Sequence, residues 1–411
     1  MAGTDLSSPE FKANPYPSYA ALRKEAPAHR VPGPMGSEIW LITRYRDARA
    51  ALGDPRFAKD PQHAPEWAKL LAGGASDEGP FGRNMLNSDP PDHTRQRRLV
   101  SMAFTNKRVE RLKPRIAEIT AELADAMAGK RTADLMAEFA HPLPITVICE
   151  LLGIPVADRH EFATWTRMLL ASPSTPEGVE SRRRGNQLMN DYLSALVERI
   201  RPGVDPALDY DAQPDLLSAL MVPWQEDRLS ERELLGMIKL LLVAGHETTV
   251  NHIGNGMLAL LLRPDQLELL RARRELLPKA VEELLRFDGP IERVPWRFTT
   301  EDVDLGTVTI PRGSAVNVVL GSADRDLTQF ANADELDITR AENQHLAFGF
   351  GVHYCLGAPL ARAESRIAFD TLLTRFPRLA LAVPPRELRW EIGGPNIMRG
   401  LGALPVTFDG E

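Results

Sequence analysis

The chain has 411 residues, of which 43% are hydrophobic and 26% are charged, and its formal net charge is -7. This composition is typical of a globular protein and excludes collagen-like, coiled-coil and largely disordered chains. The acidic balance argues against nucleic-acid binding, because proteins that bind nucleic acids usually carry a basic surface. The length alone allows two or three domains.

The N-terminus does not place a basic stretch before an apolar one, so no signal peptide is expected. No apolar run is long enough to cross a bilayer, which predicts a cytoplasmic protein without a membrane partner. The only two cysteines are Cys149 and Cys355. Two thiols exclude a disulfide framework and any zinc site that needs three or four thiolates.

The chain contains no internal repeat and no clear linker, which favours one large unit over residues 1–411. Taken in chain order, the pattern of apolar, glycine and proline residues predicts helices, strands and irregular segments. These are a strand over Ile39 to Thr43, an irregular segment over Asp60 to Asn87, a helix over Ile116 to Ala128, an irregular segment over Ser172 to Gly178, a helix over Asn186 to Arg199, and strands over Thr307 to Ile310 and Ala315 to Leu320. The fold is therefore predicted to be mainly α with a minor β portion.

A long central helix is predicted between Ser230 and Pro264. Ser230 with Glu233 forms a capping-box signature at its start, and no proline interrupts it. In its middle, Gly245 and Thr248 lie near the same face. They form either a polar notch that holds water or a diatomic ligand, or a helix-packing glycine beside a threonine bonded to a carbonyl one turn back.

The neighbouring His246 and Glu247 begin like a zinc-protease motif, but Val250 stands where the second histidine is required. The zinc-protease hypothesis therefore fails.

The most specific stretch runs from Phe348 to Pro359 and contains Cys355. A proline suits the first turn of a following helix, and a cysteine before that turn feels free N–H groups that favour the thiolate. A lone buried thiolate suits iron ligation. Two other interpretations remain: a buried hydrophobe, which is accepted for Cys149, and a nucleophilic pair of Cys355 with His353.

The stretch Phe348-x-x-Gly351-x-x-x-Cys355-x-Gly357 resembles the haem signature of the cytochrome P450 monooxygenases. The segments Ala244 to Thr248, Glu283-x-x-Arg286 and Pro15 to Tyr19 are similar to further motifs of this family, in the family's order. The resemblance covers nearly the whole chain. It implies the P450 fold, a haem b cofactor (iron protoporphyrin IX) and Cys355 as the axial iron ligand.

The resemblance also implies partners for the two haem propionates, namely His93, Arg97, Arg297 and His353. Buried carboxylates need such cationic or hydrogen-bonding partners. The alternative for each arginine is a surface ion pair, and this alternative is weakest for Arg97.

Behind the haem, Glu283 and Arg286 are expected to pair, since they lie one helical turn apart. A later arginine often completes this structural set in the family. Glu335 stands at the expected position, so Arg340 is the candidate for the third member.

The implied reaction inserts one oxygen atom from O2 into a C–H or C=C bond. Thr248 would hydrogen-bond the bound oxygen, and Glu247 would help to pass protons inward. Electrons would come from a separate ferredoxin and ferredoxin reductase, because no flavin or iron–sulfur domain is expected in this sequence. Candidate contacts for the ferredoxin are Arg95, Arg98, Arg362 and Arg366.

The overall resemblance is to actinobacterial enzymes that tailor macrolides and other polyketides, which implies a large, mainly apolar substrate. The candidate pocket residues are Met85, Leu86, Leu241, Ala244, Val294, Ile397 and Met398, for each of which plain core packing is the alternative. Two other functions stay open: a peroxide-using haem-thiolate peroxygenase and a non-catalytic haem-binding protein. A monomer is the default expectation.

Overall fold

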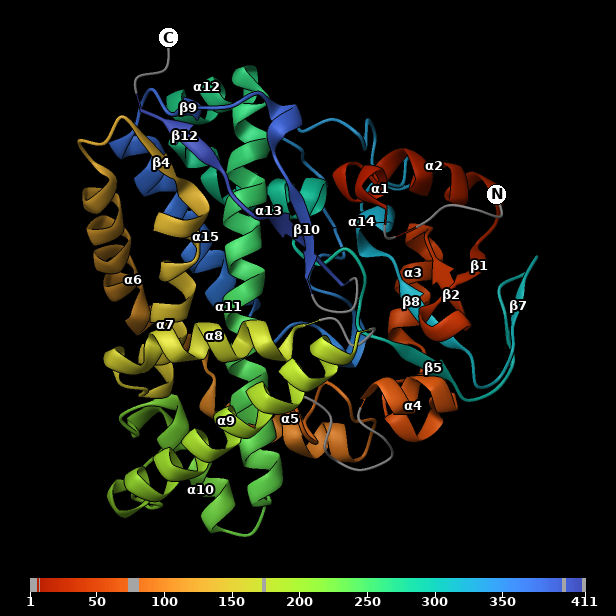
Figure 1. The fold of residues 1–411 in the computed structure, drawn as a ribbon, viewed down its shortest axis with the longest axis vertical. Helices are drawn as coiled ribbons and strands as arrows, with labels where there is room; N and C mark the ends of the chain where they lie inside the picture. The colour runs from red at the N-terminus through yellow and green to blue at the C-terminus, as the bar shows by residue number, and fades with distance from the viewer. Residues whose placement is uncertain (1–5, 7, 73–80, 172–174, 394–396, 409–411) are drawn as a thin grey trace.

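The computed structural model describes residues 6, 8–72, 81–171, 175–393 and 397–408, and helices make up most of it, as the sequence predicts (Figure 1). The α-helices are α1 (Pro9–Ala13), α2 (Tyr16–Glu25), α3 (Tyr45–Gly53), α4 (Glu66–Ala72), α5 (Asp92–Ala103), α6 (Asn106–Met127), α7 (Pro142–Leu152), α8 (Arg159–Leu169), α9 (Pro176–Ile200), α10 (Leu216–Gln225), α11 (Glu231–Leu261), α12 (Pro264–Ala272), α13 (Leu277–Asp288), α14 (Leu320–Ala323) and α15 (Ala358–Arg375).

The strands are short and form the minor part of the fold. They are β1 (Ala28–Pro32), β2 (Glu38–Ile42), β3 (Phe57–Ala58), β4 (Thr132–Asp134), β5 (Arg297–Thr299), β6 (Val303–Asp304), β7 (Thr309–Ile310), β8 (Ala315–Val318), β9 (Ala380–Leu381), β10 (Trp390–Gly393), β11 (Met398–Leu401) and β12 (Pro405–Thr407). The main sheet has the order β1-β2-β8-β5-β3, in which β2 and β8 are parallel and the other pairs antiparallel.

Figure 1 shows α11 running through the middle of the molecule, with α6, α7 and α15 on one side and the main sheet with α2 and α3 on the other. The predicted capping box at the start of α11 is confirmed: Ser230 Oγ accepts the Glu233 N–H, and the Glu233 carboxylate accepts the Ser230 N–H at 2.9 Å. The helix ends at Leu261, before Pro264 opens α12. Most of its side chains are buried, so α11 forms the centre of the core.

The segment from Asp60 to Asn87 is more regular than predicted. It contains the helical turn η2 (Pro61–His63) and the helix α4. The ring of Trp67 in α4 meets Trp296 edge-on, with ring centroids 5.2 Å apart, and this tertiary contact has no signature in the local sequence. The glycines that indicated a loop follow the helix, and residues 73–80 lie outside the described part of the chain.

Helix α9 begins ten residues before the predicted Asn186. Thr175 caps it by accepting the Gly178 N–H at 3.1 Å, and Pro176 occupies its first position. The first half of α9 is rich in charged residues and lacks the apolar repeat on which the prediction rested. Of the predicted irregular segment from Ser172 to Gly178, residues 172–174 lie outside the described part.

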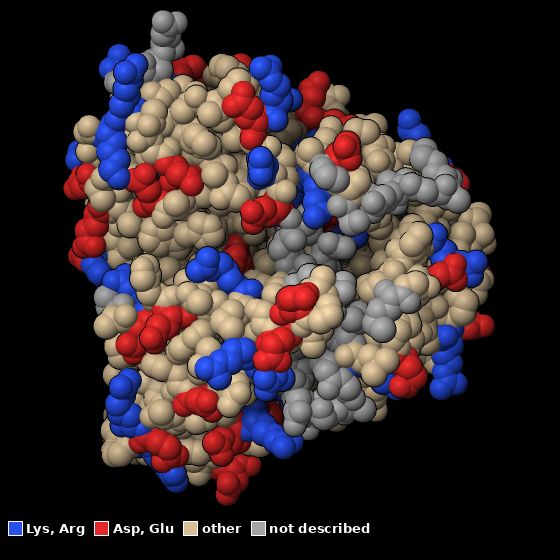
Figure 2. Space-filling view, viewed as in Figure 1, with Lys and Arg blue, Asp and Glu red and all other residues tan. Residues whose placement is uncertain are grey.

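On the face shown in Figure 2, acidic and basic side chains are interspersed, in keeping with a modest net charge. Within the described ranges, no helix combines the length and the apolar character that crossing a bilayer requires.

Candidate functional site

The loop that carries Cys355 is held in a conformation that depends on glycine. Gly349 and Gly351 have φ angles of 73° and 75°, a region that other residues rarely adopt. A Cβ on Gly351 would also lie 3.0 Å from the Leu52 carbonyl oxygen of α3. The Cys355 N–H donates to the Phe348 carbonyl oxygen at 2.9 Å, which closes the loop.

The sulfur of Cys355 lies at the start of α15, as the sequence predicts. The N–H groups of Gly357 and Ala358 donate to it, and Arg97 adds a positive charge nearby; each of these lowers the pKa of the thiol. Burial is the larger effect and raises the pKa of Cys355 above its ordinary value. A coordinating metal ion removes the thiol proton outright, so this sulfur is suited to a metal rather than to a free thiolate.

The four expected propionate partners come from different elements but converge on one region. His93 and Arg97 lie one turn apart on α5, Arg297 opens β5, and His353 belongs to the helical turn η8 (Gly351–His353) before the cysteine. The rings of His93 and His353 lie 4.2 Å apart between centroids. The structure therefore brings together residues from sequence positions 93 to 353.

His93 and Arg297 are buried, Arg97 and His353 are half-buried, and the group is incompletely paired. Both ring nitrogens of His93 and the Nε of Arg297 lack a hydrogen-bond partner among the described residues. Burial lowers the pKa of Arg297 to about 10 and that of His353 to about 2, and in His353 the charge of Lys59 adds to the effect. A buried group of bases without enough acceptors fits a ligand that supplies carboxylates, as the two propionates of haem do.

Two residues of this region were not predicted from the sequence, Lys59 and Asp89. Lys59 is 6% exposed, and burial together with Arg297 lowers its pKa well below the ordinary value. The Asp89 carboxylate accepts the backbone N–H of Lys59 at 2.9 Å and that of Asp60 at 2.8 Å. For Asp89, the only signal in the sequence was its position at the start of the Asp-Pro-Pro stretch. No sequence signal pointed to Lys59.

The structure also places Arg340 against Glu283. Glu283 holds Arg286 through two hydrogen bonds of 2.8 Å, and Arg340 Nε donates to the same carboxylate at 3.0 Å. The carbonyl oxygen of Glu335 accepts from Arg286 at 3.0 Å, so this position takes part through its backbone. Asn343, which the sequence did not single out, donates to Glu283 at 3.1 Å.

The middle of α11 presents an accessible polar face. Thr248 Oγ1 donates to the Ala244 carbonyl oxygen at 2.7 Å, the bond one turn back that the sequence suggests. Ala244 is exposed and Thr248 half-buried, although Val243 and Thr249 beside them are buried. A Cβ on Gly245 would lie 3.1 Å from the Ile148 side chain of α7, which is the helix-packing interpretation of this glycine.

Glu247 and His246 lie beside this face. Burial raises the pKa of Glu247 above its ordinary value. Burial lowers the pKa of His246 to about 3, so its ring is neutral at pH 7. His246 Nδ1 lies 3.7 Å from a Glu247 carboxylate oxygen, and this contact is therefore not an ion pair at neutral pH.

The expected pocket residues form two groups, the first of which lies on α11 and beside it. In the first, Leu241 and Ala244 lie one turn apart on the helix, and Met85 and Leu86 lie in the turn ahead of α5. The backbone of this turn packs closely on α11, because a Cβ on Gly236 would lie 2.4 Å from the Arg83 carbonyl oxygen.

In the second group, Val294 precedes β5, Met398 begins β11, which pairs with β10, and Ile397 directly precedes β11. The Ile397 carbonyl oxygen accepts the N–H of Glu292 at 2.9 Å and that of Arg293 at 3.2 Å, which joins the two segments. Val294 and Met398 are buried, so packing and ligand contact both remain open for them.

The four arginines expected to meet a ferredoxin differ in their surroundings. Arg95 is held by the Glu233 carboxylate, and Arg362 forms two hydrogen bonds of 2.7 Å with Glu282. Arg98 is exposed and Arg366 half-buried. Two of the four cations thus already serve internal ion pairs.

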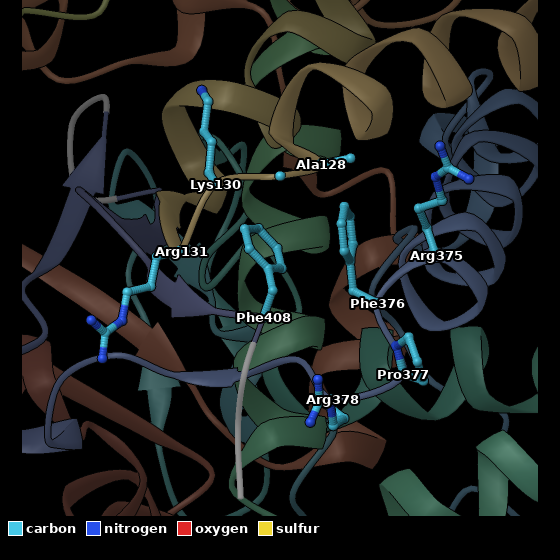
Figure 3. A pocket seen from close by; sticks show the side chains of 9 residues that line it. Ala128, Lys130, Arg131, Arg375, Phe376, Pro377, Arg378 and Phe408 are labelled. Atoms are coloured by element: carbon cyan, nitrogen blue, oxygen red, sulfur yellow. The ribbon is translucent and has the colours of Figure 1, made fainter.

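A pocket of about 660 Å³ lies elsewhere, where α6 and α15 both end (Figure 3). Figure 3 shows Phe376 and Phe408 facing each other, with ring centroids 4.4 Å apart. Beside the pocket, Lys130 pairs with Glu138, and Arg375 pairs with Asp125. Arg375 is the last residue of α15, where the helix dipole favours a basic side chain. Since α15 has 18 residues and is about 27 Å long, this pocket is remote from Cys355.

Comparison with known proteins agrees with this geometry. The family model described as Cytochrome P450 matches residues 33–385. The chain is 50% identical over 404 residues to Cytochrome P450 monooxygenase PikC of Streptomyces venezuelae, covering 97% of this chain and 92% of that protein. It is 42% identical over 401 residues to mycinamicin IV hydroxylase/epoxidase of Micromonospora griseorubida, covering 95% and 94%.

Among solved structures, myxobacterial cytochrome P450 CYP267B1 in complex with myristic acid is similar, with a TM-score of 0.91 and 41% identity. That similarity covers 99% of each chain. A family model that matches most of the chain, relatives at this level of identity and the loop around Cys355 all lead to one assignment. The chain belongs to the cytochrome P450 family and is an oxygenase.

Proposed function

We propose that this protein is a haem-thiolate monooxygenase that inserts one oxygen atom from O2 into a large, mainly apolar small molecule of the macrolide or polyketide type. The observation that carries the proposal is the sulfur of Cys355, which receives two backbone N–H groups at the start of α15. We further propose that residues 1–411 form one catalytic domain.

The residues present fit haem b. Cys355 would ligate the haem iron, and His93, Arg97, Arg297 and His353 would hold the two propionates, because buried nitrogens of His93 and Arg297 lack other partners and Arg97 and His353 lie in the same region. Haem bound in this way supplies oxygen activation, and a thiolate ligand donates electron density that favours O–O cleavage. The ion pairs of Glu283 with Arg286 and Arg340 would stabilise the part of the fold that supports the cysteine loop.

On α11, Thr248 and Glu247 would accept and donate protons. The hydroxyl proton of Thr248 is directed to the Ala244 carbonyl oxygen, so lone pairs of Oγ1 remain to accept a hydrogen bond from a ligand at this accessible face. The raised pKa of Glu247 brings its protonated form closer to neutral pH, where a carboxylic acid can donate and then regain a proton.

The substrate class rests on the relatives and on the residues flanking α11. One relative is named a mycinamicin IV hydroxylase/epoxidase and another a 6-deoxyerythronolide B hydroxylase, so hydroxylation and epoxidation both belong to the proposal. The candidate lining is apolar and consists of Met85, Leu86, Leu241, Ala244, Val294, Ile397 and Met398.

Electrons would come from a separate ferredoxin and its reductase. We expect Arg98 to contact the ferredoxin, because it is exposed and directly follows Arg97, one of the expected propionate partners. We expect the enzyme to act as a monomer. The cytoplasmic location expected from the sequence stays a prediction.

The decisive experiment is the absorbance spectrum of the dithionite-reduced protein with and without carbon monoxide. We expect a strongly red-shifted Soret band that is lost in Cys355→Ala and retained in the matched control Cys149→Ala. Cys149 is fully buried, and burial raises the pKa of its thiol to about 12, so it serves as a cysteine that packs rather than ligates. A band typical of histidine-ligated haem, or a red-shifted band in Cys355→Ala, would contradict the proposal.

Substrate turnover separates this function from its alternatives. A monooxygenase requires ferredoxin, reductase and O2 to convert a macrolide or polyketide substrate, whereas a peroxygenase works with hydrogen peroxide alone. A haem-binding protein without catalytic function gives no product under either condition.

A further inference from the structure

Lys59 directly follows β3, the strand that pairs with β5 in the main sheet. In the antiparallel pair of β3 and β5, Phe57 faces Thr299 and Ala58 faces Phe298. Extending this register by one residue past the end of β3 places Lys59 across from Arg297, and the charge of Arg297 contributes to the lowered pKa of Lys59. Residues directly opposite each other project to the same side of a sheet, and like charges there are destabilising unless another group offsets them.

The contacts of Lys59 hold its ammonium group near the start of β5. Lys59 Nζ donates to the Pro295 carbonyl oxygen at 2.9 Å and to the Trp296 carbonyl oxygen at 3.0 Å. An ammonium has three N–H groups, so one remains without an acceptor among the described residues. Lys59 is as buried as the bases that face the expected propionates, since its exposed fraction is 6%.

The charges of this region do not balance within the chain. The group of bases comprises the buried Lys59, His93 and Arg297 and the half-buried Arg97 and His353. Of the described carboxylates, Asp89 is the one that raises the pKa values of members of this group, and both of its oxygens already accept backbone N–H groups from Lys59 and Asp60. One carboxylate is too few for Lys59, Arg97 and Arg297, and uncompensated buried charge is costly.

We propose that Lys59 is a further cofactor-binding residue. Asp89 holds its backbone N–H, the Pro295 and Trp296 carbonyl oxygens position its ammonium group, and that group balances the charge of the haem carboxylates. This inference rests on the proposed function, because it assumes that haem binds at Cys355. It adds a lysine to a set that the sequence limited to two histidines and two arginines.

The test compares the release of haem from the purified holoprotein to an excess of apomyoglobin in three variants. Lys59→Met removes the charge and the donors, Lys59→Gln removes the charge but keeps N–H donors, and Lys59→Arg keeps the charge. We expect haem release to be about tenfold faster in the first two variants and within about threefold of the wild type in the third, as for loss of a charge-assisted hydrogen bond.

Lys239→Met is the matched control. Lys239 is also a buried lysine, but its Nζ donates to Asn186 Oδ1 at 3.0 Å and lies on the side of α11 that faces α9. We expect this variant to release haem at the wild-type rate. Amide hydrogen exchange of the segment from Pro295 to Arg297 provides a second readout that does not depend on turnover.

Lys59→Gln could show both the wild-type rate of haem release and the wild-type hydrogen-exchange protection of the segment from Pro295 to Arg297. In that case Lys59 only anchors the backbone, and the inference is wrong. Release at the wild-type rate in Lys59→Met, from a protein that shows the red-shifted carbon monoxide band, overturns the inference but not the proposed function. The absence of that band in the wild type overturns the proposed function itself.

Discussion

Two buried charged groups lie close to the cysteine loop, and they differ in how completely they are paired. Around Arg286, all five guanidinium N–H groups find acceptors in Glu283 and in the carbonyl oxygens of Asp324, Ala333 and Glu335. Around His93 and the other expected propionate partners, buried nitrogens lack acceptors among the described residues.

The difference separates a group that serves the fold from one that serves a ligand. Burial of a charge is tolerated when its hydrogen bonds are all made, and such a group rigidifies the structure without any further partner. A group of bases with nitrogens left over is stabilised only when a ligand supplies the acceptors. Four predictions test this distinction.

The fully paired group should control stability. Arg286→Met leaves the Glu283 carboxylate with fewer cationic partners in the core, so we expect the free energy of unfolding to fall by about 3–5 kcal/mol. Urea unfolding followed by circular dichroism measures this. The exposed pair of Arg183 with Glu180 provides the control, since Arg183→Met should leave the free energy of unfolding nearly unchanged. Equal losses in both variants would remove the basis of the comparison.

A buried base can also lack a partner because it is neutral, and His246 represents this case. Its pKa of about 3 lies below the ordinary value of 6.5, so the unfolded chain binds the proton more readily than the folded one between these values. Stability is therefore retained above pH 6.5 and lost as the pH falls below it, by about 2 kcal/mol at pH 5.

His246→Gln should remove that share of the acid sensitivity, measured as the difference between unfolding free energies at pH 6.5 and 5. The exposed His63 serves as control in His63→Gln, which should leave the difference unchanged. An unchanged acid sensitivity in His246→Gln would mean that His246 is charged in the folded protein.

The incompletely paired group should control haem retention instead of folding. For Arg97→Leu we expect haem release to apomyoglobin to be about tenfold faster, because a charge-assisted hydrogen bond to a carboxylate is lost. The neighbouring Arg98 is exposed, so Arg98→Leu should release haem at the wild-type rate. Wild-type haem release in Arg97→Leu would place Arg97 outside the cofactor site.

The smallest effect concerns the surface. Arg98→Glu should lower the ferredoxin-supported rate about threefold at low ionic strength, with less effect at high salt, because exposed charges are screened. The corresponding change Arg362→Glu would break an internal pair with Glu282 and affect folding as well, so it is the poorer probe. A rate that is insensitive to Arg98→Glu would exclude this face for ferredoxin.

Local sequence patterns were sufficient for the elements whose signals are short in range. The capping box of Ser230 and Glu233, the bond from Thr248 to Ala244 and the position of Cys355 before α15 all depend on residues within a few positions of one another. Such contacts follow from helix geometry alone, so the sequence contains the information needed to predict them.

By contrast, α4 and the first half of α9 were missed, because α4 is held by a distant tryptophan and α9 begins with charged residues. The same limit applies to the site. The chain by itself determined the haem-type loop, the residue types that surround it and Arg340 as a candidate partner of Glu283. Only the tertiary structure brought Lys59 close to Arg297 and showed the hydrogen bond from Arg340 to Glu283. Their pairing depends on strand register and on loop closure over distances of 57 to 238 residues, and no local propensity encodes either of them.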